Sequence, residues 1–381
     1  MTENDKIKTV ILVNKARFKF SRNFDEDKLN EKLLRIKTLY NANQIPIGQK
    51  FADTLEEEVI RKSIHGTAGI EGNPLTEDEV GDVLDETDPK KLLDDSEQQI
   101  KNLQSAYGIF KEIDLSIILN LNIDEELITK FHRLITANLN NEDNVPGKYR
   151  SSGVIVGDKE HGGVYKPPKI AKDVISLMKF YEEWISSDDL KNIDPIYRSA
   201  IAHYHIGKIH PFGDGNGRTA RIAESYLLRG AGYKYAPEML SNYYYRNLDE
   251  YFIVFSKTIK NKEQDLTSFI DFMMDGMIWS LENIHEKLMV WVRKLALKNN
   301  YLDLWNDGNL TQRLYDLLIS ILSLDDEKFE FSAKSIFKNA PFESLYRKIN
   351  VRAVGRDLSK LESMKLIVKS ESGLYKLYLG E

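Results

Sequence analysis

Apolar residues recur at intervals of three and four along most of this chain, which is the spacing of amphipathic helices. The segments predicted to be helical are residues 27–40, 54–71, 96–113, 127–139, 170–184, 196–209, 219–228 and 267–297. Short β runs that turn back on themselves are expected at residues 154–168 and 366–378. The pattern therefore predicts a mainly α fold with β-hairpins.

A polar loop of unusual composition lies between the helical segments 196–209 and 219–228. It reads His-Pro-Phe-Gly-Asp-Gly-Asn-Gly-Arg-Thr-Ala-Arg over residues 210–221. Glycines allow tight turns, and the free N–H groups at the start of the following helix favour an anion such as phosphate. The glycines that would form this cradle are Gly213, Gly215 and Gly217.

The charged side chains of this loop suit a nucleotide. Arg218 and Arg221 are three positions apart, so both are expected to face the anion from one side of the helix. Asp214 can lie beside a phosphate only with a cation between them, usually Mg²⁺. His210 is the one group of the loop that takes up a proton near neutral pH. The loop predicts a site for Mg-nucleotide and proton abstraction, against the alternative of a plain turn with surface arginines.

Composition sets wide limits. The chain has 381 residues, 42% of them apolar, which favours two to three domains with ample core. Its net charge of −6 is too small to indicate a partner, and the absence of cysteine excludes disulfides and cysteine nucleophiles. We expect a cytoplasmic protein, because no signal-peptide pattern and no apolar run of membrane-spanning length is present.

The helix predicted at residues 54–71 starts favourably and ends unfavourably. Thr54 is available as its cap, and acidic residues follow. Glu71 stands at the C-terminal end, where the helix dipole disfavours a carboxylate, just before the helix-stopping Gly72. Such a position suggests a distant partner, and a solvated glutamate is the equal alternative.

The loop closely resembles the signature of Fic-domain proteins, His-Pro-Phe-x-Asp/Glu-Gly-Asn-Gly/Lys-Arg-x-x-Arg, at every fixed position. The resemblance implies transfer of AMP from ATP to a Ser, Thr or Tyr hydroxyl of a protein, the chain itself included. It implies that His210 takes the proton and that Asp214 holds Mg²⁺. Asn216 and the loop N–H groups would stabilise the α-phosphate, and Arg218 and Arg221 would orient the β- and γ-phosphates.

A second motif precedes the signature. Residues 67–72 read Thr-Ala-Gly-Ile-Glu-Gly, which matches the Fic autoinhibitory motif Ser/Thr-x-x-x-Glu-Gly/Asn. The resemblance implies that Thr67 and Glu71 are inhibitory and that Glu71 pairs with Arg221. The chain thus resembles the subclass with an N-terminal inhibitory helix.

The predicted hairpin at 154–168 follows a Pro-Gly-Lys-Tyr-Arg turn and resembles the Fic flap, which lines the nucleotide and pairs with the target peptide. The resemblance also suggests that Tyr251 borders the adenine. The flap residues expected at the nucleotide are Val154, Ile155, Val156 and Gly157.

Helices predicted at 310–324, 333–337 and 351–364, followed by the hairpin at 366–378, form the winged-helix pattern. Basic residues outnumber acidic ones between residues 347 and 369. This region is therefore compatible with DNA contacts and equally with docking to a protein.

We expect an N-terminal helical region at 1–120 carrying the inhibitory helix, a Fic core at 121–298 and a winged helix at 299–381. ATP and Mg²⁺ are the expected cofactors, and a homo-oligomer is compatible with the sequence. The same site would also suit removal of AMP, with Glu71 positioning water, or transfer of UMP or phosphate. A DNA-binding or docking regulator with a nucleotide-sensing Fic domain is the alternative from another class.

Two histidines in the segment before the loop suggest a further alternative, a metal site. His203 and His205 could be combined with His210 and Asp214 as zinc ligands. Residues two apart on a helix point about 200° away from each other, so this pair chelates poorly and zinc is disfavoured.

Overall fold

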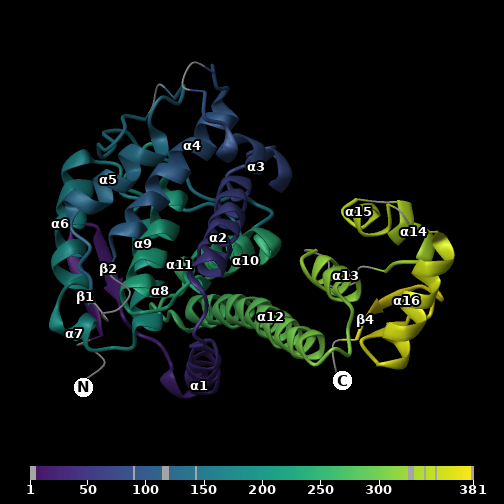
Figure 1. Ribbon diagram of the computed structural model, residues 1–381. Coiled ribbons are helices and arrows are strands. Elements are labelled where there is room, and N and C mark those ends of the chain that lie inside the picture. Colours follow the sequence, from purple (N-terminus) through teal and green to yellow (C-terminus); the bar gives the residue numbers. More distant parts are fainter. Residues whose placement is uncertain are drawn as a thin grey trace. The chain divides into compact units, whose positions relative to one another are not determined.

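The computed structural model describes residues 6–88, 91–113, 120–141, 144–324, 330–338, 340–347 and 350–378 (Figure 1). Helices dominate, and strands among these residues form small antiparallel pairs, so the predicted mainly α fold is confirmed. The chain divides into two compact units, Met1–His285 and Glu286–Glu381, inside the long helix α12 (Thr267–Asn306). The domain boundaries expected near residues 120 and 298 stay predictions.

Two buried helices in the first unit carry the polar loop between them. Helix α8 (Pro195–Ile209) packs along α9 (Asn216–Gly230), as Figure 1 shows. Asp194 accepts a hydrogen bond from the Ile196 N–H at 3.1 Å, so α8 begins at a cap followed by proline. The neighbouring helices of the unit are α5 (Glu125–Thr136), α6 (Ala171–Ile185), α7 (Asp188–Lys191), α10 (Ala236–Arg246) and α11 (Leu248–Lys260).

The N-terminal part of the unit begins with a hairpin, in which β1 (Ile7–Ile11) pairs antiparallel with β2 (Arg17–Ser21). Helices follow. These are α1 (Glu26–Ala42), α2 (Gln49–Ile70), α3 (Glu77–Asp85), α4 (Asp95–Gly108) and the 3-10 helix η2 (Ile109–Glu112). Of these helices, α2 contacts α9 and α10, and α4 contacts α5.

Helix α2 begins earlier than predicted, at Gln49 instead of residue 54. The Thr54 hydroxyl does not cap it and instead donates to the Lys50 carbonyl at 3.0 Å within the helix. Buried Leu55 and half-buried Phe51 continue the apolar face toward Gly48, so packing extends the helix past the expected cap. The predicted end is confirmed, because Glu71 is the C-terminal cap residue.

The segment 154–168 follows the predicted hairpin path with very little strand. Val156 and Tyr165 exchange backbone hydrogen bonds at 2.9 and 2.8 Å, and this bridge is isolated. Gly157 and Gly163, both on the turn side of this bridge, have φ of 81° and 92°. These left-handed conformations turn the backbone out of the ladder and limit the pairing.

The second unit has its own core. Its elements are α13 (Gln312–Leu322), α14 (Ala333–Lys338), α15 (Glu343–Tyr346), α16 (Val351–Ser363), β3 (Ile367–Lys369) and β4 (Tyr375–Leu377). Strands β3 and β4 pair antiparallel, and Phe331 bridges to Tyr375 beside them. The helices and hairpin lie where the sequence predicted them, while the winged-helix assignment stays an interpretation. No described helix, in either unit, is long and apolar enough to span a membrane.

Candidate active site

The loop between α8 and α9 turns sharply because two of its residues adopt left-handed backbone conformations. His210 ends α8 with φ 53°, and Gly215 precedes α9 with φ 74°. A Cβ on Gly215 would lie 2.9 Å from a methyl group of Thr136, so both the conformation and the space require glycine there. The N-terminus of α9 is thereby presented to the loop.

Side chains from other elements hold the loop in this shape. His132 of α5 stacks on Phe212 with ring centroids 3.7 Å apart. Its Nδ1 accepts from the Gly147 N–H at 2.9 Å, so Nε2 carries the proton that is donated to the Asp214 carbonyl at 3.0 Å. Asn216 both accepts from the Phe212 N–H and donates to the Phe212 carbonyl, at 2.9 and 3.0 Å.

The His210 ring has a defined tautomer. Its Nδ1 lies 3.3 Å from the Gly207 carbonyl oxygen, which can only accept, so Nδ1 carries the proton and Nε2 keeps a lone pair. Burial lowers the pKa of His210 to about 4. A neutral imidazole with a free Nε2 is the state that a general base requires.

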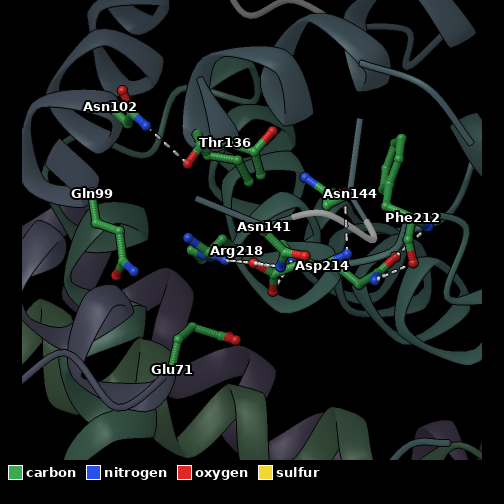
Figure 2. A network of polar contacts seen from close by, with 12 residues as sticks. Glu71, Gln99, Asn102, Thr136, Asn141, Asn144, Phe212, Asp214 and Arg218 are labelled. Carbon is green, nitrogen blue, oxygen red and sulfur yellow. Dashed lines mark hydrogen bonds and ion pairs between the residues drawn. The ribbon is translucent and has the colours of Figure 1, made fainter. Parts of the chain in front are cut away.

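Asp214 lies beside Arg218 in the middle of the loop (Figure 2). One carboxylate oxygen accepts from Arg218 at 2.9 Å, and the other accepts from the Gly215 N–H at 2.6 Å. Burial opposes the charge, but Arg218 and Gly215 outweigh it, so the pKa of Asp214 lies below its usual 3.8. Asp214 is thus an ionised, partly exposed carboxylate.

The two signature arginines point in different directions. Arg218 is 2% exposed, and its Nε and Nη1 have no hydrogen-bond partner among the residues that the structure describes. Arg221 faces α2, where it forms an ion pair with Glu71 at 2.6 Å and donates to the Thr67 hydroxyl at 2.9 Å. Of the two arginines, therefore, Arg218 is the one whose described contacts leave side-chain donors available for an anion at the loop.

The Glu71 carboxylate reaches Arg221 across the start of α9. A Cβ on Gly217 would lie 2.6 Å from a Glu71 carboxylate oxygen and 2.9 Å from Arg221 Nη1. Gly217 therefore provides the space in which this ion pair forms. The partner that the sequence suggested for Glu71 is present.

A pocket of about 260 Å³ opens between the flap and α11. Of the predicted flap residues, Val156 and Gly157 line it, whereas Ile155 is exposed. Tyr251 is 5% exposed and does not line the pocket. Apolar and polar side chains of α11 line it instead, and the sequence interpretation missed them although their helical spacing could have indicated a face. They are Phe252, Phe255, Ser256 and Ile259.

Arg150 is a further residue that the sequence interpretation did not single out. Its buried guanidinium donates to the carbonyls of His210, Ser152 and Pro168 at 2.7, 2.6 and 2.7 Å. It thereby joins both ends of the flap to the loop. The Tyr-Arg ending of the turn before the flap was the available signal.

The histidines of α8 do not converge on a metal. His205 Nε2 contacts the backbone of Ser21, while His203 contacts Glu224 and Tyr251. Among the described residues, no group of three or more His, Cys, Asp or Glu side chains is arranged to hold a metal ion.

Comparisons with known proteins identify the class. Residues 122–228 match the model of the Fic/DOC family. Curated proteins named protein adenylyltransferase Fic are similar over half of their length. The one from Drosophila yakuba is 26% identical over 270 residues, 68% of this chain and 50% of that protein. The one from Drosophila virilis is 29% identical over 277 residues, 70% of this chain and 51% of that protein.

Solved structures agree on the fold. A Fic family protein from Desulfovibrio desulfuricans has a TM-score of 0.55 at 21% identity, covering 92% of this chain and 95% of its own. Fic-1 from C. elegans has a TM-score of 0.55 at 20% identity, covering 69% and 74%. Residues 122–228 thus match the Fic/DOC family, and the chain has the fold of Fic proteins of known structure.

Proposed function

We propose that this chain is a protein adenylyltransferase that transfers AMP from ATP to a Ser, Thr or Tyr hydroxyl of a protein, which can be the chain itself. The proposal rests chiefly on one juxtaposition within the signature loop. Neutral His210 with its free Nε2 and the unpartnered buried nitrogens of Arg218 belong to the same loop. Orphaned cationic donors suit a phosphate, and a neutral imidazole suits a hydroxyl proton.

In the proposed reaction the hydroxyl oxygen bonds to the α-phosphorus while the bond from that phosphorus to the pyrophosphate oxygen breaks. His210 Nε2 takes the hydroxyl proton, and pyrophosphate leaves. The N–H groups at the start of α9 would stabilise charge on the α-phosphate. The pocket lined by Val156, Gly157 and α11 would take the adenine, since it is apolar and adjoins the flap.

Asp214 suits Mg²⁺ carried by the nucleotide. Magnesium in nucleotide sites is usually held by one or two carboxylates together with phosphates and water, and Asp214 is a single ionised, partly exposed carboxylate. When bound, Mg²⁺ neutralises charge on the phosphates.

The ion pair between Glu71 and Arg221 supports autoinhibition. A guanidinium engaged by a carboxylate at 2.6 Å cannot also give its paired donors to the terminal phosphates. ATP would then bind in a pose poorly aligned for in-line attack, and small misplacements are costly in rate. We therefore propose that Glu71, with Thr67, restrains transfer.

Removal of AMP at the same site is the second candidate function. The Glu71 side chain is 26% exposed, so its carboxylate has access to solvent and could position a water molecule. DNA binding by α16 and a cytoplasmic location stay predictions.

The test uses ATP labelled at either the α- or the γ-phosphate, with wild type and Glu71→Gly at equal ATP. Adenylyl transfer predicts that the α-label, and not the γ-label, becomes attached to protein. Retention of the γ-label would identify phosphate transfer. Label retained from UTP in place of ATP would identify another nucleotide, and release of AMP from modified protein would identify the hydrolytic reaction.

A further inference from the structure

Arg221 is held from two sides that belong to different parts of the fold. Its side chain is only 1% exposed, and its contacts with Thr67 and Glu71 both come from α2. Burial opposes the charge on Arg221, but Glu71 and then Tyr251 of α11 outweigh it and raise the pKa of Arg221, so the Tyr251 hydroxyl adjoins the guanidinium on the other side. The α2 contacts are the ones that inhibition would have to release, whereas the contact with α11 is independent of α2.

The contact with Tyr251 continues into a buried polar chain. The Tyr251 hydroxyl lies 2.9 Å from His203 Nε2, and His203 Nδ1 lies 3.0 Å from a Glu224 carboxylate oxygen. Tyr244 donates to both Glu224 oxygens at 3.1 Å. All of these side chains are at most 5% exposed, so this row of polar contacts is shielded from water.

The guanidinium of Arg221 favours one order of donors and acceptors along this row of side chains. A guanidinium only donates, so the Tyr251 oxygen accepts and its O–H is donated to His203 Nε2. Nδ1 must then carry the imidazole proton, and it faces a Glu224 carboxylate oxygen at 3.0 Å. Burial raises the pKa of Tyr251 to about 12, so this hydroxyl keeps its proton. In this order the imidazole of His203 links Tyr251 to a buried carboxylate.

We propose that Tyr251, His203 and Glu224 are positioning residues that keep Arg221 aimed at the nucleotide when Glu71 withdraws. This inference rests on the proposed function. When a buried arginine exchanges a carboxylate for a phosphate, another partner must keep its side chain in place. Residues on α8, α9 and α11 can serve as that partner, because these helices belong to the core around the signature loop. Tyr251 thus acts behind Arg221 and does not border the adenine.

The test is a double-mutant cycle between Tyr251→Phe and Glu71→Gly, read as the Kd values for Mg-ATP and for AMP. In the Glu71→Gly background, Tyr251→Phe should weaken ATP binding roughly tenfold, as expected for loss of a hydrogen bond to a charged group. AMP binding should change less than about twofold, because AMP lacks the phosphates that Arg221 would meet. With Glu71 present, the same substitution should have a smaller effect on ATP.

Tyr204→Phe is the matched control, because Tyr204 is a buried tyrosine of α8 whose hydroxyl has no partner among the described residues. It should leave both Kd values unchanged. Equal effects of Tyr251→Phe on ATP and AMP, or equal effects in both backgrounds, would indicate general loosening and overturn the inference. Failure of Glu71→Gly itself to bind ATP would instead overturn the proposed function.

Discussion

The protonation of His210 depends on its surroundings more than on the residue type. The Gly207 carbonyl keeps the proton on Nδ1, and burial lowers the pKa to about 4. The base is therefore ready at neutral pH and is lost only when Nε2 becomes protonated. Because the pKa of His210 is lowered, its neutral form persists to more acidic pH than that of an ordinary histidine.

We expect kcat/KM for AMP transfer by Glu71→Gly to stay flat on acidification through pH 6.5 and to fall toward pH 4. The measurement is a pH profile of label incorporation, with binding of ATP followed in parallel. His210→Ala should bind ATP and transfer little, a loss of roughly 10²–10⁴-fold. A midpoint near 6.5, or near-normal turnover of His210→Ala, would contradict the assigned role.

Asp214 offers a test of the metal. Asp214→Asn keeps the size of the side chain and removes its charge, so Mg²⁺-dependent transfer should fall by about a hundredfold or more. EDTA should have the same effect on the unmodified chain. Asp189→Asn, at a carboxylate that pairs with Arg22 away from the loop and the flap, is a suitable charge control. Full activity restored only by Zn²⁺ would instead favour a histidine metal site.

Some residues of the candidate site are neighbours in the sequence, and others are brought to it from distant parts of the chain. His210, Asp214 and Arg218 are close together in one loop, so their residue types indicated chemistry directly. Arg150 and His132 act through contacts with distant backbone groups, which one sequence does not reveal. Tyr251 was expected at the adenine from resemblance alone, and its place beside His203 depends on helix packing.

Among the elements, α2 carries the inhibitory residues and lies very close to α10. A Cβ on Gly66 would be 2.8 Å from backbone atoms of Asn242 and from the Ser241 carbonyl oxygen. Backbone cannot rotate away as a side chain can, so any larger residue at this position must push the helices apart. The position of Glu71 therefore depends on a glycine one turn earlier in the same helix.

Gly66→Val should destabilise the fold by about 1–3 kcal/mol and raise AMP transfer, though less than Glu71→Gly does. Thermal unfolding and label incorporation would be measured together. Gly48→Ala is the control, because no atom lies within 4 Å of the added Cβ. Loss of stability with unchanged transfer would show that α2 does not restrain the enzyme through this contact.

The tip of the flap is fastened to α11 by a histidine between two carboxylates. His161 lies 2.8 Å from Asp158 and 3.2 Å from Asp249, and Lys260 donates to the nearby Gly162 carbonyl. Hydrogen bonds with Asp158 and then Asp249 raise the pKa of His161 above its usual 6.5. The charged form therefore fastens the flap at acid pH, and this contribution is lost as pH rises through the raised pKa.

We expect an NMR titration to give His161 a pKa above 6.5, and we expect Asp249→Asn to lower that pKa. Asp189→Asn, at a carboxylate that pairs with Arg22 in another part of the unit, should leave it unchanged. A midpoint at or below 6.5 in the unmodified chain would contradict the two-carboxylate arrangement.

Over the whole molecule, the order of elements followed the periodicity of the sequence, and several element ends did not. Helix α2 starts early because the packed face of Phe51 and Leu55 outweighs the cap at Thr54. The flap pairs at one bridge because neighbouring glycines turn the backbone away. Local patterns thus predict elements well, while their limits depend on tertiary packing.

The second unit is a candidate for nucleic-acid contact through the exposed side of α16, where Arg352, Arg356 and Lys360 lie. If this face binds duplex DNA, Arg352→Ala with Arg356→Ala should weaken binding by the full chain and lower the salt slope by about 2. Lys15→Ala with Lys50→Ala, at exposed lysines of the first unit, is the control. Equal binding by all variants would favour protein docking.

The central claim is that one site transfers AMP by His210 and is restrained by Glu71. The most direct test is incorporation of α-labelled AMP at equal ATP by wild type, Glu71→Gly, Glu71→Gln and Glu71→Gly with His210→Ala. Both single variants should exceed wild type, because each removes the charge that holds Arg221, and the double variant should lose the gain. If neither single variant shows an increase, Glu71 does not restrain transfer. If the double variant keeps full activity, His210 is not the base for the reaction.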